Sequence, residues 1–165
     1  MNFLYPADDD PRRAARRPLL VFLLATLAVG AVASLFTEPN LSWYEALRGP
    51  SFAPPAWLLP PLWTALYVLM AVAAWRVWKV VGLKSTAMAL YALQLAFTFA
   101  WTALFFGPHR LGLAFLAVSM LAGLALATGI LFWGHDRWAG WLYLPCLLGA
   151  GFAAVLVRFF QALNP

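Results

Sequence analysis

The hydrophobic pattern divides the chain into five long apolar runs, separated by short polar or proline-rich stretches. A helix needs about 20 apolar residues to cross the hydrocarbon core of a bilayer, and the runs have that length. The predicted spans cover about residues 18–36, 57–80, 86–106, 111–133 and 138–162. The connections after the third and fourth runs are short, so the helices that they join must be antiparallel. The pattern therefore predicts an all-α membrane protein, a bundle of five transmembrane helices.

The first 17 residues differ from the rest because three aspartates are followed there by four arginines. We expect a polar tail over residues 1–17 and a transmembrane domain over residues 18–165. The first run reaches Ala31-Val32-Ala33 just before Ser34, so it also resembles a secretory signal with its cleavage site. N-terminal sequencing of the mature protein would separate these two interpretations.

The segment between the first two runs is rich in proline and tryptophan. Proline fixes φ and lacks a backbone donor, so Pro50, Pro54 and Pro55 exclude a membrane-crossing helix there. Trp and Tyr side chains favour the boundary between lipid and water. Loops of this length are usually lids, binding loops or disordered, and the aromatic content argues against disorder. We therefore predict that residues 37–56 form a long, stiff loop that covers one end of the bundle as a lid.

The third run has two different faces. At about 100° per residue, Tyr91, Gln94, Thr98, Trp101 and Phe105 share one sector, and Ala92, Ala96, Ala100 and Ala103 lie opposite. Small residues let helix backbones approach closely in lipid, so the alanine face predicts a dimer interface, with packing inside the monomer as the alternative. The amide of Gln94 needs a partner in hydrocarbon, so it either links helices or lines a pocket.

Composition and charge exclude several classes of protein. The chain is 64% hydrophobic and 10% charged, with a mean hydropathy of +0.80, which excludes a soluble domain of this size. The net charge of +5 comes from basic residues at the ends of the runs, so anionic lipid headgroups are expected as partners and nucleic acid is not. Eight Lys and Arg residues lie on the N-terminal side of the membrane and three on the other. The positive-inside rule then places the N-terminus in the cytoplasm.

The residues needed for most catalytic chemistry are missing from the runs. No carboxylate lies within any of them, which leaves no acid–base pair. His109 and His135 fall on opposite sides of the predicted membrane and cannot share a metal ion. Cys146 is the only cysteine and has no disulfide partner within the chain. We predict no catalytic residue and no metal site, which disfavours a conventional enzyme.

Several motifs resemble one known family. In and after the lid they are Trp43-Tyr44, Pro50, Pro54-Pro55, Trp57, Trp63-Thr64 and Leu66-Tyr67. In the later runs they are Tyr91, Gln94-Leu95, Trp101, Phe105-Phe106-Gly107 and Pro145. Over about residues 20–164 this pattern resembles the tryptophan-rich sensory protein/translocator protein family, TspO/MBR. The resemblance implies a five-helix bundle, usually dimeric, whose pocket beneath the first loop takes porphyrins, sterols or benzodiazepine-like compounds.

The chain departs from the family pattern within that pocket. The family's lysine and tryptophan in Lys-Pro-x-Trp-x-Pro-Pro are Gly49 and Phe52 here, and its asparagine four residues after the glutamine is Thr98. In the last run its tyrosine and tryptophan are Cys146 and Gly149. We therefore expect no light-driven porphyrin breakdown, which the resemblance ties to the two replaced tryptophans. We also expect a larger and less polar pocket, unless neighbouring side chains close the gap.

The residues expected to bind the ligand come from the lid and three runs: Tyr44, Phe52, Pro54, Pro55, Trp57, Trp63, Tyr67, Tyr91, Gln94, Thr98, Trp101, Phe105, Cys146 and Gly149. We predict a homodimeric sensor or carrier in a bacterial membrane that holds a tetrapyrrole such as haem, an isoprenoid or carotenoid, or a sterol-like lipid, with no required cofactor. One alternative is a membrane enzyme acting on a tetrapyrrole or isoprenoid. A further alternative is a structural partner in a membrane assembly.

Overall fold

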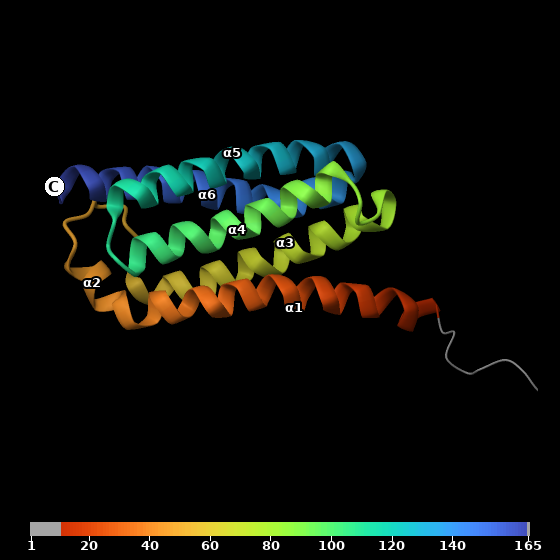
Figure 1. The fold of residues 1–165 in the computed structure, drawn as a ribbon, viewed down its shortest axis with the longest axis horizontal. Helices are drawn as coiled ribbons and strands as arrows, with labels where there is room; N and C mark the ends of the chain where they lie inside the picture. Colours follow the sequence, from red (N-terminus) through yellow and green to blue (C-terminus); the bar gives the residue numbers. More distant parts are fainter. Residues whose placement is uncertain (1–10, 165) are drawn as a thin grey trace, which may run out of the picture.

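The computed structural model describes residues 11–164, and every element in that range is helical. The long helices are α1 (Pro11–Thr37), α3 (Leu59–Val81), α4 (Thr86–Phe106), α5 (Leu111–His135) and α6 (Arg137–Leu163). The short elements are η1 (Glu38–Asn40), α2 (Leu41–Ala46) and η2 (Ala56–Leu58). Within the described part of the chain, five helices are long and apolar enough to cross a membrane. This confirms the predicted five-helix membrane bundle (Figure 1).

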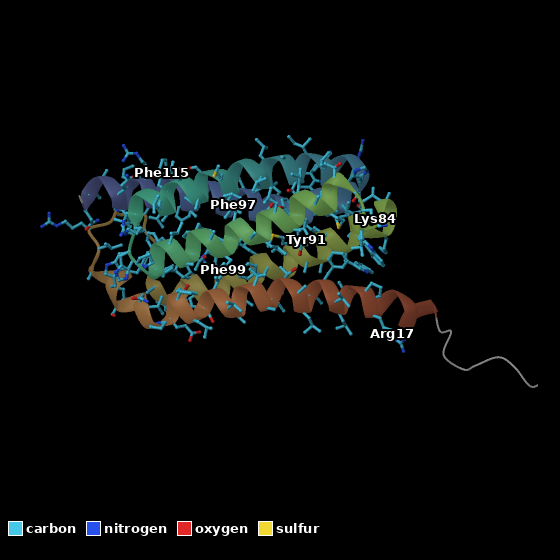
Figure 2. The ribbon with its side chains drawn as sticks, in the orientation of Figure 1. Arg17, Lys84, Tyr91, Phe97, Phe99 and Phe115 are labelled. Atoms are coloured by element: carbon cyan, nitrogen blue, oxygen red, sulfur yellow. The ribbon has the colours of Figure 1, made fainter. Side chains whose placement is uncertain are left out.

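The five long helices form a closed ring. Helix α1 packs against α3 and α4, α3 also packs against α6, and α5 packs against both α4 and α6. The short elements between α1 and α3 lie at one end of the bundle, where the chain also ends after α6 (Figure 1). Arg17 and Lys84 lie at the other end (Figure 2). The ring encloses a core made largely of alanine and aromatic side chains, with Ala73, Ala74 and Val77 of α3 fully buried.

Close helix contacts in this ring depend on glycines. A Cβ atom at Gly140 of α6 would lie 2.5 Å from Cε3 of Trp133 on α5, and one at Gly30 of α1 would lie 2.6 Å from Cε2 of Tyr67 on α3. Both distances are too short for a carbon–carbon contact. Each glycine therefore makes room for an aromatic ring of the neighbouring helix.

Asp136 organises the end of the bundle opposite the lid. Its carboxylate accepts hydrogen bonds from the N–H groups of Trp138 (2.8 Å) and Ala139 (3.1 Å), which caps α6. It also forms an ion pair with Arg76 of α3 at 2.8 Å. Burial by itself raises the pKa of Asp136, but the hydrogen bond from Ala139 and the contact with Arg76 outweigh it, so the pKa is held below its usual value. The ionised carboxylate therefore stabilises the junction of α3 with α6.

Some boundaries differ from those expected. Residues 1–10 of the predicted polar tail lie outside the described residues, and α1 already starts at Pro11, so residues 11–17 of that tail are helical. The predicted loop 37–56 contains η1 and α2. Helix α2 forms because Leu41–Ala46 lies in the proline-free stretch between Pro39 and Pro50 and Tyr44 on it becomes buried.

The alanine face of α4 lies on the surface of the monomer. Ala92 and Ala96 are exposed, and Ala100 and Ala103 are half-buried. The opposite face, which carries Gln94 and Trp101, is buried in the bundle. Ala92 and Ala96 are thus not packed inside the monomer, while their role in a dimer stays a prediction.

Candidate functional site

The lid lies on the end of the bundle and not away from it. Tyr44 of α2 is 6% exposed, and its ring contacts those of Phe106 on α4 and Phe160 on α6 at centroid distances of 6.3 and 5.4 Å. Its hydroxyl donates a hydrogen bond to the carbonyl oxygen of Pro54 at 2.8 Å. The buried tyrosine thus joins the first half of the lid to the second half over the core.

Two further contacts hold the lid at its edges. On one side, the ring of Trp43 stacks on that of His109, 3.9 Å between centroids, and Nε2 of His109 lies 3.1 Å from Oδ1 of Asn40. On the other side, Asn164 pairs with both backbone polar groups of Arg48. His109 lies in the connection between α4 and α5, and Asn164 follows α6. The lid is therefore fastened to three different helices or their ends.

A small cavity of about 50 Å³, which we call the interior cavity, lies beneath the lid, and its wall reaches the outside of the bundle at the exposed Leu62 and Phe152. Its lining is almost entirely apolar: Tyr44, Pro54, Leu59, Leu62, Trp63, Leu66, Trp101, Phe105, Phe106, Gly149, Phe152, Ala153, Leu156 and Val157. Sites for drug-sized molecules usually measure about 300–1,000 Å³. A ligand beneath the lid therefore requires some of these side chains to move.

A larger groove of about 370 Å³ runs between α1 and α3, with α4 as its floor. It is lined by Leu27, Gly30, Ala31, Ala33, Ser34, Thr37, Glu38, Leu59, Pro60, Trp63, Thr64, Tyr67, Trp101, Thr102 and Phe106. Its volume falls within the usual range for small-molecule sites. Because Ala31 and Thr64 on its walls are exposed, the groove opens on the side of the bundle.

Trp63 and Trp101 separate the groove from the interior cavity. Both tryptophans line both spaces, and their ring centroids lie 5.5 Å apart with the planes at 49°. Trp101 is 6% exposed, and its buried indole N–H has no hydrogen-bond partner within the described residues. Leaving such a donor unpaired costs about 1–3 kcal/mol. The partition between the two spaces thus contains an unsatisfied polar group.

The structure brings some of the predicted ligand-binding residues together and leaves others apart. Tyr44, Pro54, Trp63, Trp101, Phe105 and Gly149 line the interior cavity, and Tyr67 lines the groove. Gln94, Thr98 and Cys146 line a space of about 20 Å³ deeper in the bundle, together with Trp63 and Tyr67. Trp57 is 71% exposed and lines none of these three spaces. Pro55 is exposed as well, and Phe52 packs on the ring of Phe152, which lines the interior cavity, and on that of the exposed Phe159.

Gln94 and Tyr91 find partners inside the bundle. The side-chain oxygen of Gln94 accepts a hydrogen bond from the hydroxyl of Tyr143, and its Nε2 donates to Sδ of Met70 at 3.2 Å. The hydroxyl of Tyr91 pairs with that of Thr26 on α1. These bonds link α4 to α6, α3 and α1, so both side chains connect helices. Gln94 also lines the deep space, so the two interpretations of this amide coexist in the structure.

Other predicted side chains are held by their own helix or by a backbone carbonyl. The hydroxyl of Thr98 donates to the carbonyl of Gln94 at 2.9 Å, and Sγ of Cys146 donates to that of Leu66 at 3.4 Å. A Cβ atom at Gly149 would lie 2.8 Å from Cδ1 of Leu66. Leu66 therefore fills the space beside Gly149, which matches the alternative in which neighbouring side chains close the gap.

Several residues of the site were not among the predicted ligand-binding residues, although Leu66 and Phe106 belong to the motifs that resemble the family. Leu66 and Phe106 lie in apolar runs whose pattern does not distinguish them from ordinary core residues. Asn164 holds the lid, and a polar residue directly after a long apolar run was the available signal. Among the described residues, no group of three or more His, Cys, Asp or Glu side chains could hold a metal ion.

Comparison with known proteins places the chain among proteins of similar length. Residues 22–161 match the model of the TspO/MBR family. The chain is 39% identical over 132 residues to the tryptophan-rich sensory protein of Cereibacter sphaeroides, which covers 80% of this chain and 82% of that protein. It is 34% identical over 148 residues to protein CrtK of Rhodobacter capsulatus, covering 88% and 91%. It is 33% identical over 144 residues to the translocator protein of Homo sapiens, covering 84% and 85%.

Proposed function

The chain belongs to the TspO/MBR family of integral, multi-pass membrane proteins, and from that premise we propose that it binds a hydrophobic small molecule at the lid end of its bundle. The molecule is a tetrapyrrole, an isoprenoid or carotenoid, or a sterol-like lipid, and the protein acts as a sensor or carrier for it. The names of its relatives, tryptophan-rich sensory protein and translocator protein, agree with this role.

One observation carries the proposal. The groove of about 370 Å³ and the smaller interior cavity share a wall formed by Leu59, Trp63, Trp101 and Phe106. Together they provide what a small-molecule site needs, a concave and largely apolar surface with a few polar groups. The lid covers this region and is fixed by hydrogen bonds from Tyr44 and Asn164. A ligand held there would lie between the helices and be shielded from water by the lid.

A titration in lipid nanodiscs tests the proposal. Protoporphyrin IX, canthaxanthin and cholesterol serve as probes of the three ligand classes, and quenching of tryptophan fluorescence or displacement of a bound probe reports binding. We expect saturable binding of at least one probe, weakened by Trp63→Ala. Val68→Ala, which changes an exposed residue of the same helix, serves as the matched control. Failure of all three probes to saturate the wild-type protein would contradict the proposal.

We further propose that the lid lies on the side of the membrane away from the cytoplasm. Arg17 and Lys84 lie at the end opposite the lid, and the chain has eight of its Lys and Arg residues on that side against three at the lid end. The positive-inside rule supports this orientation. Labelling of a cysteine introduced at Ser51 in intact cells tests it, because an impermeant reagent should reach that position.

We also propose that the alanine face of α4 forms a homodimer interface. Exposed Ala92 and Ala96 lie four residues apart on one helix, the spacing at which small residues let helices approach closely in lipid. Ala96→Trp should lower the dimer fraction measured by cross-linking in nanodiscs. Met120→Trp, on the exposed side of α5, should leave it unchanged. A dimer that is insensitive to Ala96→Trp would place the interface elsewhere.

A further inference from the structure

The groove between α1 and α3 opens sideways. Its walls reach the outside of the bundle at Ala31 on α1 and Thr64 on α3, which are both exposed, and its floor is formed by the buried Trp101 and Thr102 of α4. In a helix bundle that spans a bilayer, an opening between two helices faces the lipid. A molecule dissolved in the bilayer would therefore reach the groove without crossing water and without opening the lid.

We propose that this groove is a lateral binding site for a neutral, lipid-soluble molecule that carries a hydrogen-bond acceptor, such as a keto oxygen, and that this oxygen pairs with the indole N–H of Trp101. The proposal rests on the function proposed above.

A buried donor at the floor of the groove, unpaired among residues 11–164, favours an acceptor on the ligand. The hydroxyls of Ser34, Thr64 and Thr102 already donate to carbonyl oxygens of their own helices, at 2.8, 2.8 and 2.9 Å. The indole N–H of Trp101, by contrast, has no partner within the described residues. Since indole only donates, a ligand oxygen that accepts is the group that would satisfy it.

The charges around the groove favour a neutral ligand. Of the described residues that line it, none is Lys or Arg, and the single ionisable carboxylate is that of Glu38. A ligand carboxylate in this place would have no counter-ion and would be repelled by Glu38. Ketones, ethers and alcohols of isoprenoid or sterol-like skeletons fit these conditions, whereas a free tetrapyrrole dicarboxylate does not.

The tryptophan pair gives this site a gate. With the rings of Trp63 and Trp101 5.5 Å apart, the groove and the interior cavity are separate spaces and the N–H of Trp101 is covered. Displacement of either ring would join the two spaces and uncover the N–H. A ligand that pairs with this donor binds the open arrangement more tightly than the closed one, so it shifts the population toward the open arrangement.

Two matched carotenoids test the hydrogen bond. Canthaxanthin and β-carotene share one carbon skeleton and differ by the two ring carbonyls. In nanodiscs we expect the wild-type protein to bind the ketone about tenfold more tightly, the ratio that one net hydrogen bond provides. Trp101→Phe keeps a ring in the partition and removes the N–H, so the preference should disappear. Equal affinities in the wild-type protein, or a preference that survives in a folded Trp101→Phe variant, would overturn the proposal.

A second pair of variants tests the route independently of Trp101. Ala31→Phe places a ring in the groove, while Val32→Phe places the same ring at the neighbouring position, which is exposed and does not line the groove. We expect Ala31→Phe to weaken binding of the ketone by about tenfold or more, because the new ring takes up apolar surface that the ligand would otherwise contact. Val32→Phe should leave the affinity unchanged. Equal effects of the two variants would exclude the lateral site.

Two porphyrins that differ in charge test the preference for a neutral ligand. Protoporphyrin IX dimethyl ester should bind more tightly than the free dicarboxylic acid. Glu38→Gln removes the repelling carboxylate, so it should reduce this difference in affinity. If no probe binds the wild-type protein saturably, the proposed function fails and this inference fails with it. If probes bind saturably but are insensitive to Ala31→Phe, Trp101→Phe and Glu38→Gln, the lateral site alone is wrong and the ligand lies elsewhere.

Discussion

Asn164, which follows α6, pairs with both backbone polar groups of Arg48 in the lid, although 116 positions separate the two residues. Its Oδ1 accepts from the N–H of Arg48 at 3.1 Å, and its Nδ2 donates to the carbonyl oxygen of Arg48 at 2.9 Å. The side-chain amide of Asn164 thus makes the two hydrogen bonds that a neighbouring backbone segment would otherwise make with Arg48. It fixes the irregular part of the lid to the end of the last transmembrane helix.

Removal of this pairing should loosen the lid. Asn164→Ala deletes both hydrogen bonds, each with a net contribution of about 1 kcal/mol, so amide exchange in residues 47–53 should become about tenfold to thirtyfold faster. Hydrogen exchange with mass spectrometry measures this rate. Asn164→Asp keeps the acceptor for the N–H of Arg48 and should show a smaller increase. Unchanged exchange in the alanine variant would mean that Tyr44 and Trp43 hold the lid without help from Asn164.

The contact between Gln94 and Tyr143 should make their substitutions non-additive. Tyr143→Phe leaves the oxygen of Gln94 without its donor, and Gln94→Leu leaves the hydroxyl of Tyr143 without its acceptor. Each single change should lower the free energy of unfolding by about 1–3 kcal/mol, and the double variant should lose less than the sum. Equilibrium unfolding in mixed micelles measures the free energy of unfolding of the two single variants and of the double variant. Strict additivity would show that the two side chains do not share a hydrogen bond in the membrane.

The glycine in α6 offers a test by compensation. Gly149→Trp introduces a large ring where even a Cβ atom would lie 2.8 Å from Cδ1 of Leu66. Overpacking of this kind costs about 1–3 kcal/mol, so the variant should unfold more readily. Leu66→Ala removes the clashing atoms, and the combined variant should recover part of the lost stability. Stability of the single variant equal to that of the wild type would show that α3 and α6 separate easily at this level.

The pKa of Asp136 predicts a pH dependence of stability. Because this pKa is lower in the folded protein than in the unfolded chain, ionised Asp136 stabilises the fold. That contribution is complete above the ordinary aspartate pKa of about 3.9 and disappears as the pH falls through the lower folded value. Asp136→Asn retains a capping oxygen but no charge, so the stability difference from the wild type should shrink as the pH falls below about 4. Thermal unfolding at a series of pH values measures this difference. A stability difference between the two proteins that stays constant to within about 0.5 kcal/mol from pH 3 to pH 7 would contradict this prediction.

Helix α4 was predictable from the sequence because its signals are local. Ser85 caps its first turn through a hydrogen bond from the N–H of Met88, and Gly107 and Pro108 end it, so the predicted bounds 86–106 coincide with the observed ones. The helical period also separates the buried face from the exposed one. Tyr91, Gln94, Thr98, Trp101 and Phe105 are all buried, while Ala92 and Ala96 are exposed.

The lid was predictable only as a segment. Its position follows from its prolines, but the direction of each side chain depends on distant contacts that no local period encodes. Tyr44 turns inward because its ring packs on those of Phe160 and Phe106, while Phe52 packs against Phe152 and Phe159, which are both partly exposed on α6. Trp57, which the family pattern groups with the pocket, is 71% exposed.

The size of the interior cavity could also not be predicted from the sequence. The replacement of a family tryptophan by Gly149 suggests an enlarged pocket, yet the result depends on which neighbour occupies the space. Leu66 occupies it, and the cavity beneath the lid measures about 50 Å³. The larger groove lies on the other side of Trp63 and Trp101, between α1 and α3, helices whose contact is not visible in either run alone.

The most direct test is an experimental structure of the protein in nanodiscs, with whichever hydrophobic probe it binds most tightly. We expect ligand density at the lid end, in contact with Trp63 and Trp101, and extending between α1 and α3. Density confined to the outer surface of α5 and α6 would contradict it. So would a saturated complex in which the groove and the space beneath the lid are both free of ligand.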